Sequence, residues 1–266
     1  MRFLKPKHYL LMKKILVLFS LCALISCQKE DKNATTTPSC LLKEVILFGG
    51  EEANDFYSVI NENEKIKEIR SVDYTDKLYY TSNGNLIKKE QFENSVARPY
   101  ITEYKYDANN NLIEVWEYDH SSNNQAIEQK EIYEYTNGKI SKITYKDLIN
   151  ASPDYSMSLI WIGDNLTSIT SQEQGMPACT YTYTYDLTKN NTIKEDFAFY
   201  YWQDPSDDYE TIREALFFSK NQLVKAVRQC NGQETFDITY SYNSNNKIKD
   251  VLIDGDKGWT FRYTCD

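Results

Sequence analysis

Tyr104-Lys-Tyr-Asp-Ala-Asn-Asn-Asn-Leu112 is the stretch of sequence that decides the fold. Two alternating tyrosines, Tyr104 and Tyr106, precede a turn rich in Asp and Asn, and an apolar residue follows it. Residues two apart lie on one face of a β-strand, and Asn and Asp tolerate the left-handed backbone that tight turns require. The stretch therefore predicts a β-hairpin with its turn at residues 107–111.

The same pattern recurs along the chain, and each copy ends in an apolar residue after the turn. We call these residues the anchors: Ile66, Leu86, Leu112, Ile140, Leu166, Ile193, Leu223 and Ile248. Their spacings are 20, 26, 28, 26, 27, 30 and 25 residues, and a steady period in this range is typical of a repeat architecture. Tyrosine occurs 22 times, and aromatic pairs across strands, at roughly 0.2–1 kcal/mol each, give a structural reason for it.

A second apolar residue often lies three positions after an anchor, at Ile69, Val115, Ile143, Ile169 and Val251. Positions i and i+3 of a regular strand face opposite sides of the sheet. Either both faces of the sheet are partly covered, or a β-bulge follows each turn. A sheet with one wet face would show cleaner alternation, so the pattern favours a sheet that is rolled or folded over.

These observations predict an all-β fold, an antiparallel meander of about eight repeated β-hairpins with a period of about 26 residues. One more strand is expected before the hairpins, at 41–48, and one after them, at 258–265. Cys40 and Cys265 then lie at the same end of the first and last strands, and we expect a disulfide that staples the meander. Cys179 and Cys230 are expected at the opposite end, three strand steps apart at about 4.8 Å per step. They can pair only if the sheet curls or the loops reach.

The first 26 residues have the composition of a secretory signal. Met12-Lys-Lys14 is basic, and residues 15–25 form an apolar run that is too short to cross roughly 30 Å of hydrocarbon. Leu24-Ile-Ser-Cys27 resembles the bacterial lipobox. The resemblance implies cleavage before Cys27, lipid on its thiol and attachment to a membrane.

The segment after Cys27 reads as a tether. Residues 27–39 are polar and include Pro38, so we expect a flexible link to a domain at 40–266. Gln28-Lys-Glu-Asp31 resembles the lipoprotein export signal of Bacteroidetes. That resemblance implies a location on the cell surface, with the periplasmic face of the outer membrane as the alternative.

Charge and histidine content exclude several classes of function. Removing residues 1–26 takes away five basic residues and no acidic one, leaving 25 basic against 39 acidic residues, a net charge of −14. Nucleic acid is therefore not an expected partner. Apart from His8, the chain has one histidine, His120, which reads as a solvated loop residue. We expect no multi-histidine metal site, no Ser/His/Asp triad and no cofactor.

One loop joins aromatic and acidic residues and is the candidate binding site of the sequence. Its residues are Tyr200, Tyr201, Trp202, Asp204, Asp207 and Asp208. Aromatic faces beside carboxylates suit sugar rings, and closely spaced acidic oxygens can hold Ca²⁺. The alternative is a solvated acidic loop whose aromatic residues cover the edge of the sheet.

The repeat resembles the YD repeat of Rhs-type proteins and the YD-like lipoproteins of Bacteroidetes. Tyr106-Asp-Ala-Asn-Asn-Asn-Leu112 is the closest copy, and the resemblance covers about residues 58–255. It implies an array of antiparallel hairpins and no catalysis. We therefore expect a non-enzymatic envelope lipoprotein that binds a glycan or an envelope protein, or that has a structural role. A carboxylate-based hydrolase and a carrier of an apolar ligand are the further alternatives.

Overall fold

The computed structural model describes residues 40–47, 55–93, 99–118, 126–149, 154–173, 175–193 and 210–265. The chain divides into two compact units, 1–38 and 39–266, and all described residues belong to the second. Among the described residues, no helix has both the length and the apolar character needed to span a membrane. The expected signal, tether and lipidation site at Cys27 lie outside the described residues.

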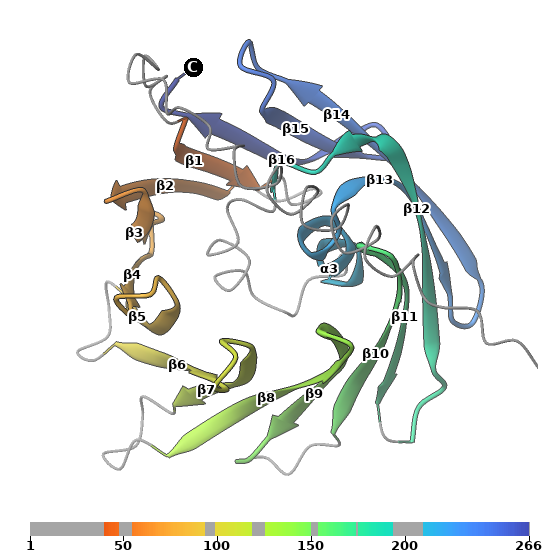
Figure 1. Cartoon of the computed structure of the whole chain (residues 1–266), viewed down its shortest axis with the longest axis horizontal. Helices are drawn as coiled ribbons and strands as arrows, with labels where there is room; N and C mark the ends of the chain where they lie inside the picture. Colours follow the sequence, from red (N-terminus) through yellow and green to blue (C-terminus); the bar gives the residue numbers. More distant parts are fainter. Residues whose placement is uncertain are drawn as a thin grey trace, which may run out of the picture. The chain divides into compact units, whose positions relative to one another are not determined.

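The described residues form sixteen β-strands and one helix. The strands are β1 (Leu42–Leu47), β2 (Asp55–Glu62), β3 (Lys65–Arg70), β4 (Tyr74–Tyr80), β5 (Leu86–Glu93), β6 (Tyr100–Tyr106), β7 (Leu112–Tyr118), β8 (Ile127–Thr136), β9 (Lys139–Asp147), β10 (Tyr155–Ile162), β11 (Asn165–Glu173), β12 (Cys179–Asn190), β13 (Asn221–Gln229), β14 (Gln233–Tyr242), β15 (Ile248–Ile253) and β16 (Asp256–Tyr263). Each strand pairs antiparallel with its neighbours in sequence, and β1 also pairs with β16, so the meander closes into a barrel (Figure 1). The predicted all-β antiparallel meander is confirmed. The sheet, which was expected to be rolled or folded over, closes completely on itself.

The seam between β1 and β16 is held by more than the strand ladder. Val45 lies opposite Phe261, and the guanidinium of Arg262 donates to a carboxylate oxygen of Glu44 at 2.6 Å. Beyond the strands, a disulfide joins Cys40 to Cys265, with 5.1 Å between their Cα atoms. The two ends of the described chain are therefore covalently tied where the barrel closes.

The hairpins follow the turn chemistry of the sequence. Asn137 and Gly138 both have positive φ, 52° and 74°, as a two-residue hairpin turn requires. In the turn after β6, one carboxylate oxygen of Asp107 accepts the backbone N–H groups of Asn109 and Asn111, at 2.8 and 2.9 Å. The Asp of this repeat copy thus stabilises the turn.

A β-bulge follows most turns, which explains the second apolar residue of each repeat. Between β6 and β7, for example, Lys105 pairs with Glu114 but Tyr106 pairs with Leu112, so one residue of β7 is unpaired. The extra residue places Leu112 and Val115 on the same face, and both are buried. Of the two explanations that the sequence left open, the structure therefore shows the bulge.

The second tyrosine of the repeat has a role that strand pairing did not predict. Its hydroxyl crosses to the preceding repeat and donates to the backbone carbonyl of that repeat's anchor. The bonds are Tyr80 to Ile66 at 2.6 Å, Tyr106 to Leu86 at 2.8 Å and Tyr135 to Leu112 at 2.9 Å, and the indole N–H of Trp161 bonds to Ile140 at 2.7 Å. A belt of side-chain donors thus links successive hairpins.

The sequence prediction was wrong between β12 and β13. The repeat copy that leads to the anchor Leu223 begins with Leu216-Phe-Phe218, and these residues were expected to end a strand. In the structure, Glu210–Phe218 is a helix, α3. Ile212, Ala215 and Leu216 recur at helical spacing and are all buried. Ser219-Lys-Asn221 resembles the hairpin turns of the repeat, yet here it joins the helix to β13. In the described chain β12 therefore pairs directly with β13.

This pairing also changes the place of the second pair of cysteines. Cys179 begins β12 and Cys230 follows β13, so they lie on neighbouring strands and not three steps apart. They form a disulfide, with Cα atoms 4.5 Å apart. No curling of the sheet is needed to join them.

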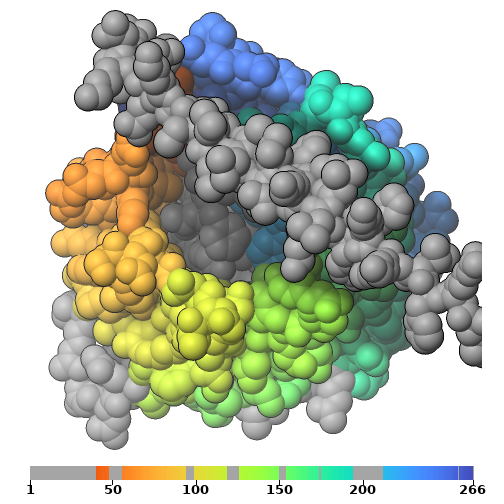
Figure 2. Space-filling view, in the orientation of Figure 1, coloured from red at the N-terminus to blue at the C-terminus, as the bar shows by residue number. Residues whose placement is uncertain are grey.

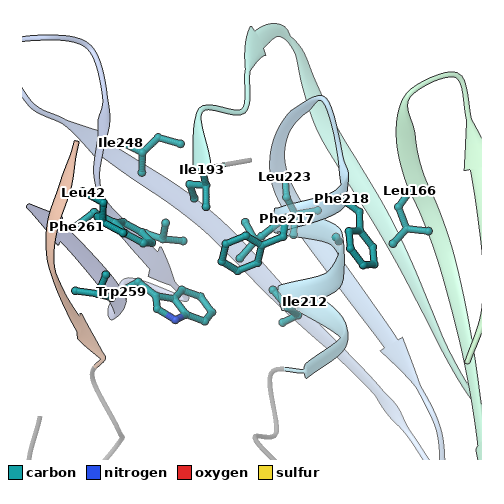
Figure 3. Close-up of a cluster of buried hydrophobic side chains, with 14 of the residues drawn as sticks. Leu42, Leu166, Ile193, Ile212, Phe217, Phe218, Leu223, Ile248, Trp259 and Phe261 are labelled. Carbon is teal, nitrogen blue, oxygen red and sulfur yellow. The ribbon is translucent and has the colours of Figure 1, made fainter. Parts of the chain in front are cut away.

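Helix α3 lies inside the ring of strands (Figure 1) and contacts β11 and β13. Phe217, Phe218 and Ile212 project from it toward Leu166 and Leu223 of the wall on one side, and Trp259 and Phe261 on the other (Figure 3). All of these side chains are buried. The hydroxyl of Ser219, just after the helix, accepts the backbone N–H of Leu166 at 3.0 Å. An apolar core thus lies between α3 and the wall of the barrel.

Candidate functional site

The loop that the sequence singled out, Tyr200, Tyr201, Trp202, Asp204, Asp207 and Asp208, lies outside the described residues, as does His120. In the part of the chain that the structure describes, no group of three or more His, Cys, Asp or Glu side chains is arranged to hold a metal ion. The candidate site of the structure is a different one, on the inner face of the wall.

We call this site the lumenal pocket. It is a cavity of about 180 Å³ lined by Glu117, Gln129, Lys130, Glu131, Tyr145, Lys146, Asp147 and Tyr155. Strand register explains how residues far apart in sequence meet there. Glu117 lies opposite Gln129, and Gln129 lies opposite Asp147. Glu131 lies opposite Tyr145, which in turn lies opposite Tyr155.

Six of the eight lining residues face inward because they alternate in step with buried core residues, whereas Lys130 and Lys146 are out of step and lie toward the outer face. Glu131 precedes the buried Tyr133 by two positions, and Tyr145 follows the buried Ile143 by two. The rings of Tyr145 and Tyr155 lie 5.4 Å apart between centroids and are tilted by 47°. The pocket therefore combines carboxylates from β7, β8 and β9 with a pair of aromatic rings from β9 and β10. In Figure 2 the orange, yellow and green parts of the wall border a hollow.

The two lysines of the pocket use their ammonium groups in other contacts. Lys130 contacts a carboxylate oxygen of Glu114 at 2.7 Å, and Lys146 contacts Asp154 at 3.0 Å. Glu114 lies on the outer face of β7, since it alternates with the inward Val115 and Glu117. The carboxylates of the pocket also have partners: Glu131 accepts the hydroxyl of Tyr133, and a carboxylate oxygen of Asp147 accepts the backbone N–H of Ile149 at 3.0 Å.

A second acidic group of the interior lies on β4 and does not line the pocket. Asp76 on β4 is fully buried, and among the described residues neither of its oxygens has a hydrogen-bond partner of ordinary geometry. Burial raises the pKa of Asp76 to about 7, although Lys89 and the amide of Gln91 are near enough to oppose the rise. Burial also raises the pKa of Tyr104, and the carboxylates of Glu117, Glu131 and Asp76 raise it further.

The outer face of strands β4 to β8 carries charged side chains that form hydrogen bonds and ion pairs. The ammonium of Lys88 lies 4.4 Å from the centre of the Tyr79 ring, and the Tyr79 hydroxyl donates to Glu90 at 2.6 Å. Further along, Lys105 and Lys130 both lie over the ring of Trp116, at 4.8 and 5.2 Å. Ion pairs and cation–π contacts therefore cover this part of the wall.

Sequence reasoning missed the lumenal pocket for a physical reason. Both faces of β7 and β8 carry charged residues, so Glu117 on the inside cannot be told from Glu114 on the outside by residue type. The available signal was register: counting by twos from the buried tyrosine of each repeat assigns Glu131 and Gln129 to the inner face. That count is reliable only when the positions of the β-bulges are known, because each bulge shifts the inward and outward alternation by one residue.

Comparison with known proteins identifies the fold. No protein family matches the chain, and no curated protein matches it in sequence. A porin-like protein from Bacteroides vulgatus ATCC 8482 superimposes with a TM-score of 0.55 and 11% identity, over 86% of this chain and 99% of that one. This chain has the fold of that protein. A porin-like protein from Bacteroides uniformis ATCC 8492 agrees, with a TM-score of 0.54 and 11% identity over 83% and 96% of the two chains.

A third solved structure, TcdB2-TccC3 without its hypervariable C-terminal region, gives a TM-score of 0.32 and 14% identity. It covers 76% of this chain and 10% of that one.

Proposed function

We propose that the protein is a non-enzymatic binding protein of the bacterial cell envelope, held at the outer membrane by lipid on Cys27 and exposed on the cell surface. The observation that carries the proposal is the lumenal pocket, a polar cavity built from the inner faces of β7, β8, β9 and β10. A closed barrel provides rigid strands for such a site, and rigid elements hold binding side chains more accurately than loops do.

The outer wall supports attachment by lipid. A lysine or arginine on the lipid-facing side of a membrane barrel costs roughly 2–4 kcal/mol at the bilayer midplane. Here the outer faces of neighbouring strands carry Lys88, Lys105 and Lys130, each in an ion pair with a glutamate. Such a wall is suited to water, so we propose that the acyl chains, and not the strands, hold the protein at the membrane.

The disulfides support a location outside the cytoplasm. Cys40–Cys265 and Cys179–Cys230 together use all four cysteines that follow residue 27. Disulfides persist in oxidising compartments and are rare where thiol reductants are abundant. This agrees with the signal-like first 26 residues and with the lipobox-like sequence at Cys27.

The character of the interior favours a polar ligand over an apolar one. The apolar part of the barrel interior is packed around α3, whose Phe217 and Phe218 are buried among wall residues. The lumenal pocket combines carboxylates with two tyrosine rings, which suits hydroxylated ligands such as glycans. The loop at Tyr200–Asp208 stays a second candidate for the same class of ligand.

The anchor is tested with metabolic labelling. Cells producing the full chain are fed a radioactive or alkyne-tagged palmitate and then treated with protease while intact. We expect label on the native protein, none on a Cys27→Ala variant, and digestion of the native protein at the cell surface. Equal labelling of both proteins would contradict lipidation at Cys27, and protection from protease would contradict surface exposure.

Binding is tested by affinity electrophoresis of the full chain through gels that contain envelope and dietary polysaccharides. We expect at least one gel to retard the native protein and to retard a Tyr155→Leu variant less. A Tyr79→Leu variant, altered on the outer wall, is the matched control and should migrate as the native protein does. Retardation that the outer-wall change abolishes, while the pocket change leaves it intact, would refute the lumenal site.

A further inference from the structure

We infer that the disulfide between Cys179 and Cys230 is a redox switch, which a dithiol reductant opens while the disulfide between Cys40 and Cys265 stays closed. We call the first the rim disulfide and the second the seam disulfide. The rim is the end of the barrel at which β11 leads into β12 and β13 leads into β14. The inference goes beyond the proposed function, because it does not depend on which ligand the lumenal pocket binds.

The two disulfides have different surroundings. Both cysteines of the seam disulfide pack against the hydrophobic core, whereas neither cysteine of the rim disulfide is among the described residues that do so. The rim disulfide lies between exposed segments: residues 175–178 precede Cys179, and residues 231–234 follow Cys230. Met176 in the first of these segments is 59% exposed. Exposed disulfides are the ones that thiols reduce most readily, so the rim disulfide is the accessible one.

A cationic side chain contacts one sulfur of the rim disulfide. The Nε–H of Arg228 donates to Sγ of Cys230 at 3.4 Å. Strand register fixes the position of this arginine, which lies opposite Tyr181 on β12 and Glu234 on β14. A guanidinium group beside a sulfur stabilises the thiolate form of a cysteine, and a more stable thiolate leaves faster in thiol–disulfide exchange. Cys230 is therefore the sulfur that is released when the bond breaks.

Glu234 opposes this effect of Arg228. One of its carboxylate oxygens lies 3.4 Å from Nη1 of Arg228, and its side chain is 59% exposed to solvent. Water screens such an ion pair, so it only partly offsets the positive charge beside the sulfur of Cys230. The two residues of the pair therefore have opposite effects on a thiolate at Cys230: Arg228 stabilises it, and Glu234 destabilises it. This difference allows a specific test.

The reaction is a thiol–disulfide exchange in two steps. The thiolate of the reductant attacks Sγ of Cys179, the bond between the two protein sulfurs breaks, and its electron pair leaves on Sγ of Cys230. The second thiol of the reductant, after losing its proton to water, attacks the reductant sulfur of the mixed disulfide and releases the thiolate of Cys179. Both protein thiolates take up protons from water. The protein gains two electrons and two protons, and the dithiol loses the same number and becomes a cyclic disulfide.

Opening the rim disulfide frees the connection between β11 and β12. The ladder between these strands ends with the pair Ser171–Cys179, so the disulfide ties the last paired residue of that ladder to the end of β13. Glu173, at the end of β11, pairs with Tyr155 of the lumenal pocket. Reduction should therefore loosen the loop at 175–178, next to the pocket, and leave the seam of the barrel unchanged.

The first experiment compares the two disulfides in the native protein, purified as the full chain in detergent. Free thiols are blocked with N-ethylmaleimide, dithiothreitol is added for increasing times, and the new thiols are labelled with deuterated N-ethylmaleimide. Peptide mass spectrometry then gives the reduction rate of each disulfide. We expect the rim disulfide to be reduced about tenfold faster than the seam disulfide, or more.

Two variants of the ion pair test the role of the cation. Arg228→Gln removes the positive charge and should slow reduction of the rim disulfide about threefold or more. Glu234→Gln removes the opposing carboxylate and should speed the reduction. Both changes break the same ion pair, so a merely structural role of the pair would change the rate in the same direction in both variants. Arg262→Gln, which breaks the ion pair with Glu44 at the seam, is the matched control and should leave the rate at the rim unchanged.

Hydrogen exchange measures what the reduction releases. The protein is reduced and alkylated at the rim disulfide alone, and the exchange of its backbone N–H groups is followed by mass spectrometry. We expect faster exchange in peptides that cover residues 175–182 and 229–234, and unchanged exchange in β1 and β16.

Three results would overturn the inference. Equal reduction rates of the two disulfides, or a faster seam disulfide, would show that the rim disulfide is not the accessible one. A change of rate in the same direction in Arg228→Gln and Glu234→Gln would show that the cation does not stabilise the leaving sulfur. Faster exchange throughout the barrel after reduction would show that the rim disulfide holds the whole fold and is not a local switch. If Arg228→Gln does not fold, the comparison of the two disulfides in the native chain still decides the inference.

Discussion

Removing the disulfide at the seam of the barrel should cost more stability than removing the other one. The first change is Cys40→Ser with Cys265→Ser, and the second is Cys179→Ser with Cys230→Ser. The bridges close loops that differ greatly in length, with sequence separations of 225 and 51 residues. In the chain-entropy account, the stabilisation by a disulfide grows with the logarithm of that length.

The magnitudes follow from those separations. The relation gives about 5 kcal/mol for the seam bridge and about 4 kcal/mol for the other, both as upper bounds at 25 °C. Folded domains are stable by only about 5–15 kcal/mol, so either loss is a large fraction of the total. The native seam keeps its β1–β16 ladder and the Arg262–Glu44 ion pair in the variant. The loss therefore arises mainly from the freedom that the unfolded chain regains.

The assay is urea unfolding followed by tyrosine and tryptophan fluorescence, in a Cys27→Ser background that lacks the acyl anchor. We expect the midpoint to fall for both double variants, and further for the seam variant. The slope of the free energy of unfolding against urea should rise, because a chain without its cross-link exposes more surface. A seam variant as stable as its parent, or more stable than the Cys179/Cys230 variant, would refute the reasoning from loop length.

Three further predictions test the core, the tyrosine belt and the buried carboxyl group. Leu166→Ala, which empties a fully buried position beside α3, should lower the free energy of unfolding by roughly 2–5 kcal/mol in urea titrations. Tyr135→Phe removes the donor to the Leu112 carbonyl and should cost about 1 kcal/mol by the same assay, and a loss below 0.3 kcal/mol would show that the belt does not stabilise the fold. The pKa of Asp76 is raised to about 7 from 3.8, so the native state keeps a proton that the unfolded state releases, and this group destabilises the fold as pH rises from about 4 to 7. The Asp76→Asn variant should therefore lack that decline and be more stable than the native protein at pH 7.5, by up to about 4 kcal/mol. Free energies of unfolding that change in parallel for the two proteins from pH 4 to 7.5 would contradict this prediction.

Most of the fold could be predicted because the repeat encodes it locally. Tyrosine alternation, Asn-rich turns and anchors about 26 residues apart each report on one hairpin, and a hairpin needs no distant information. Closure is different, since it depends on how tightly the whole sheet coils. The sequence carried one long-range indication of it, the cysteines at 40 and 265, which the structure joins at the seam.

The error at α3 shows where local reasoning fails. Leu216-Phe-Phe-Ser-Lys-Asn-Gln-Leu223 has the outline of a repeat copy, with large apolar residues, a polar turn and an anchor. The helical spacing of Ile212, Ala215 and Leu216 was the competing signal. The segment forms a helix and not a strand because a helix inside the barrel buries residues all around its surface, including Arg213 and Glu214. A strand in the wall would bury only alternate residues.

The same repeat that reveals the fold also hides the candidate site. The tyrosine hydroxyls that link the hairpins, such as that of Tyr106 bonded to Leu86, are structural, so an abundance of tyrosine indicates architecture and not ligand binding. The pocket instead depends on residues between the repeat motifs, such as Glu117, Asp147 and Tyr155, whose identity the hairpin does not constrain. A protein with the same motifs but other residues at these inward positions would keep the barrel and change its ligand. The ligand class should therefore follow the inward residues of β7 to β10, and exchanging these alone between two barrels of this fold should exchange their specificity.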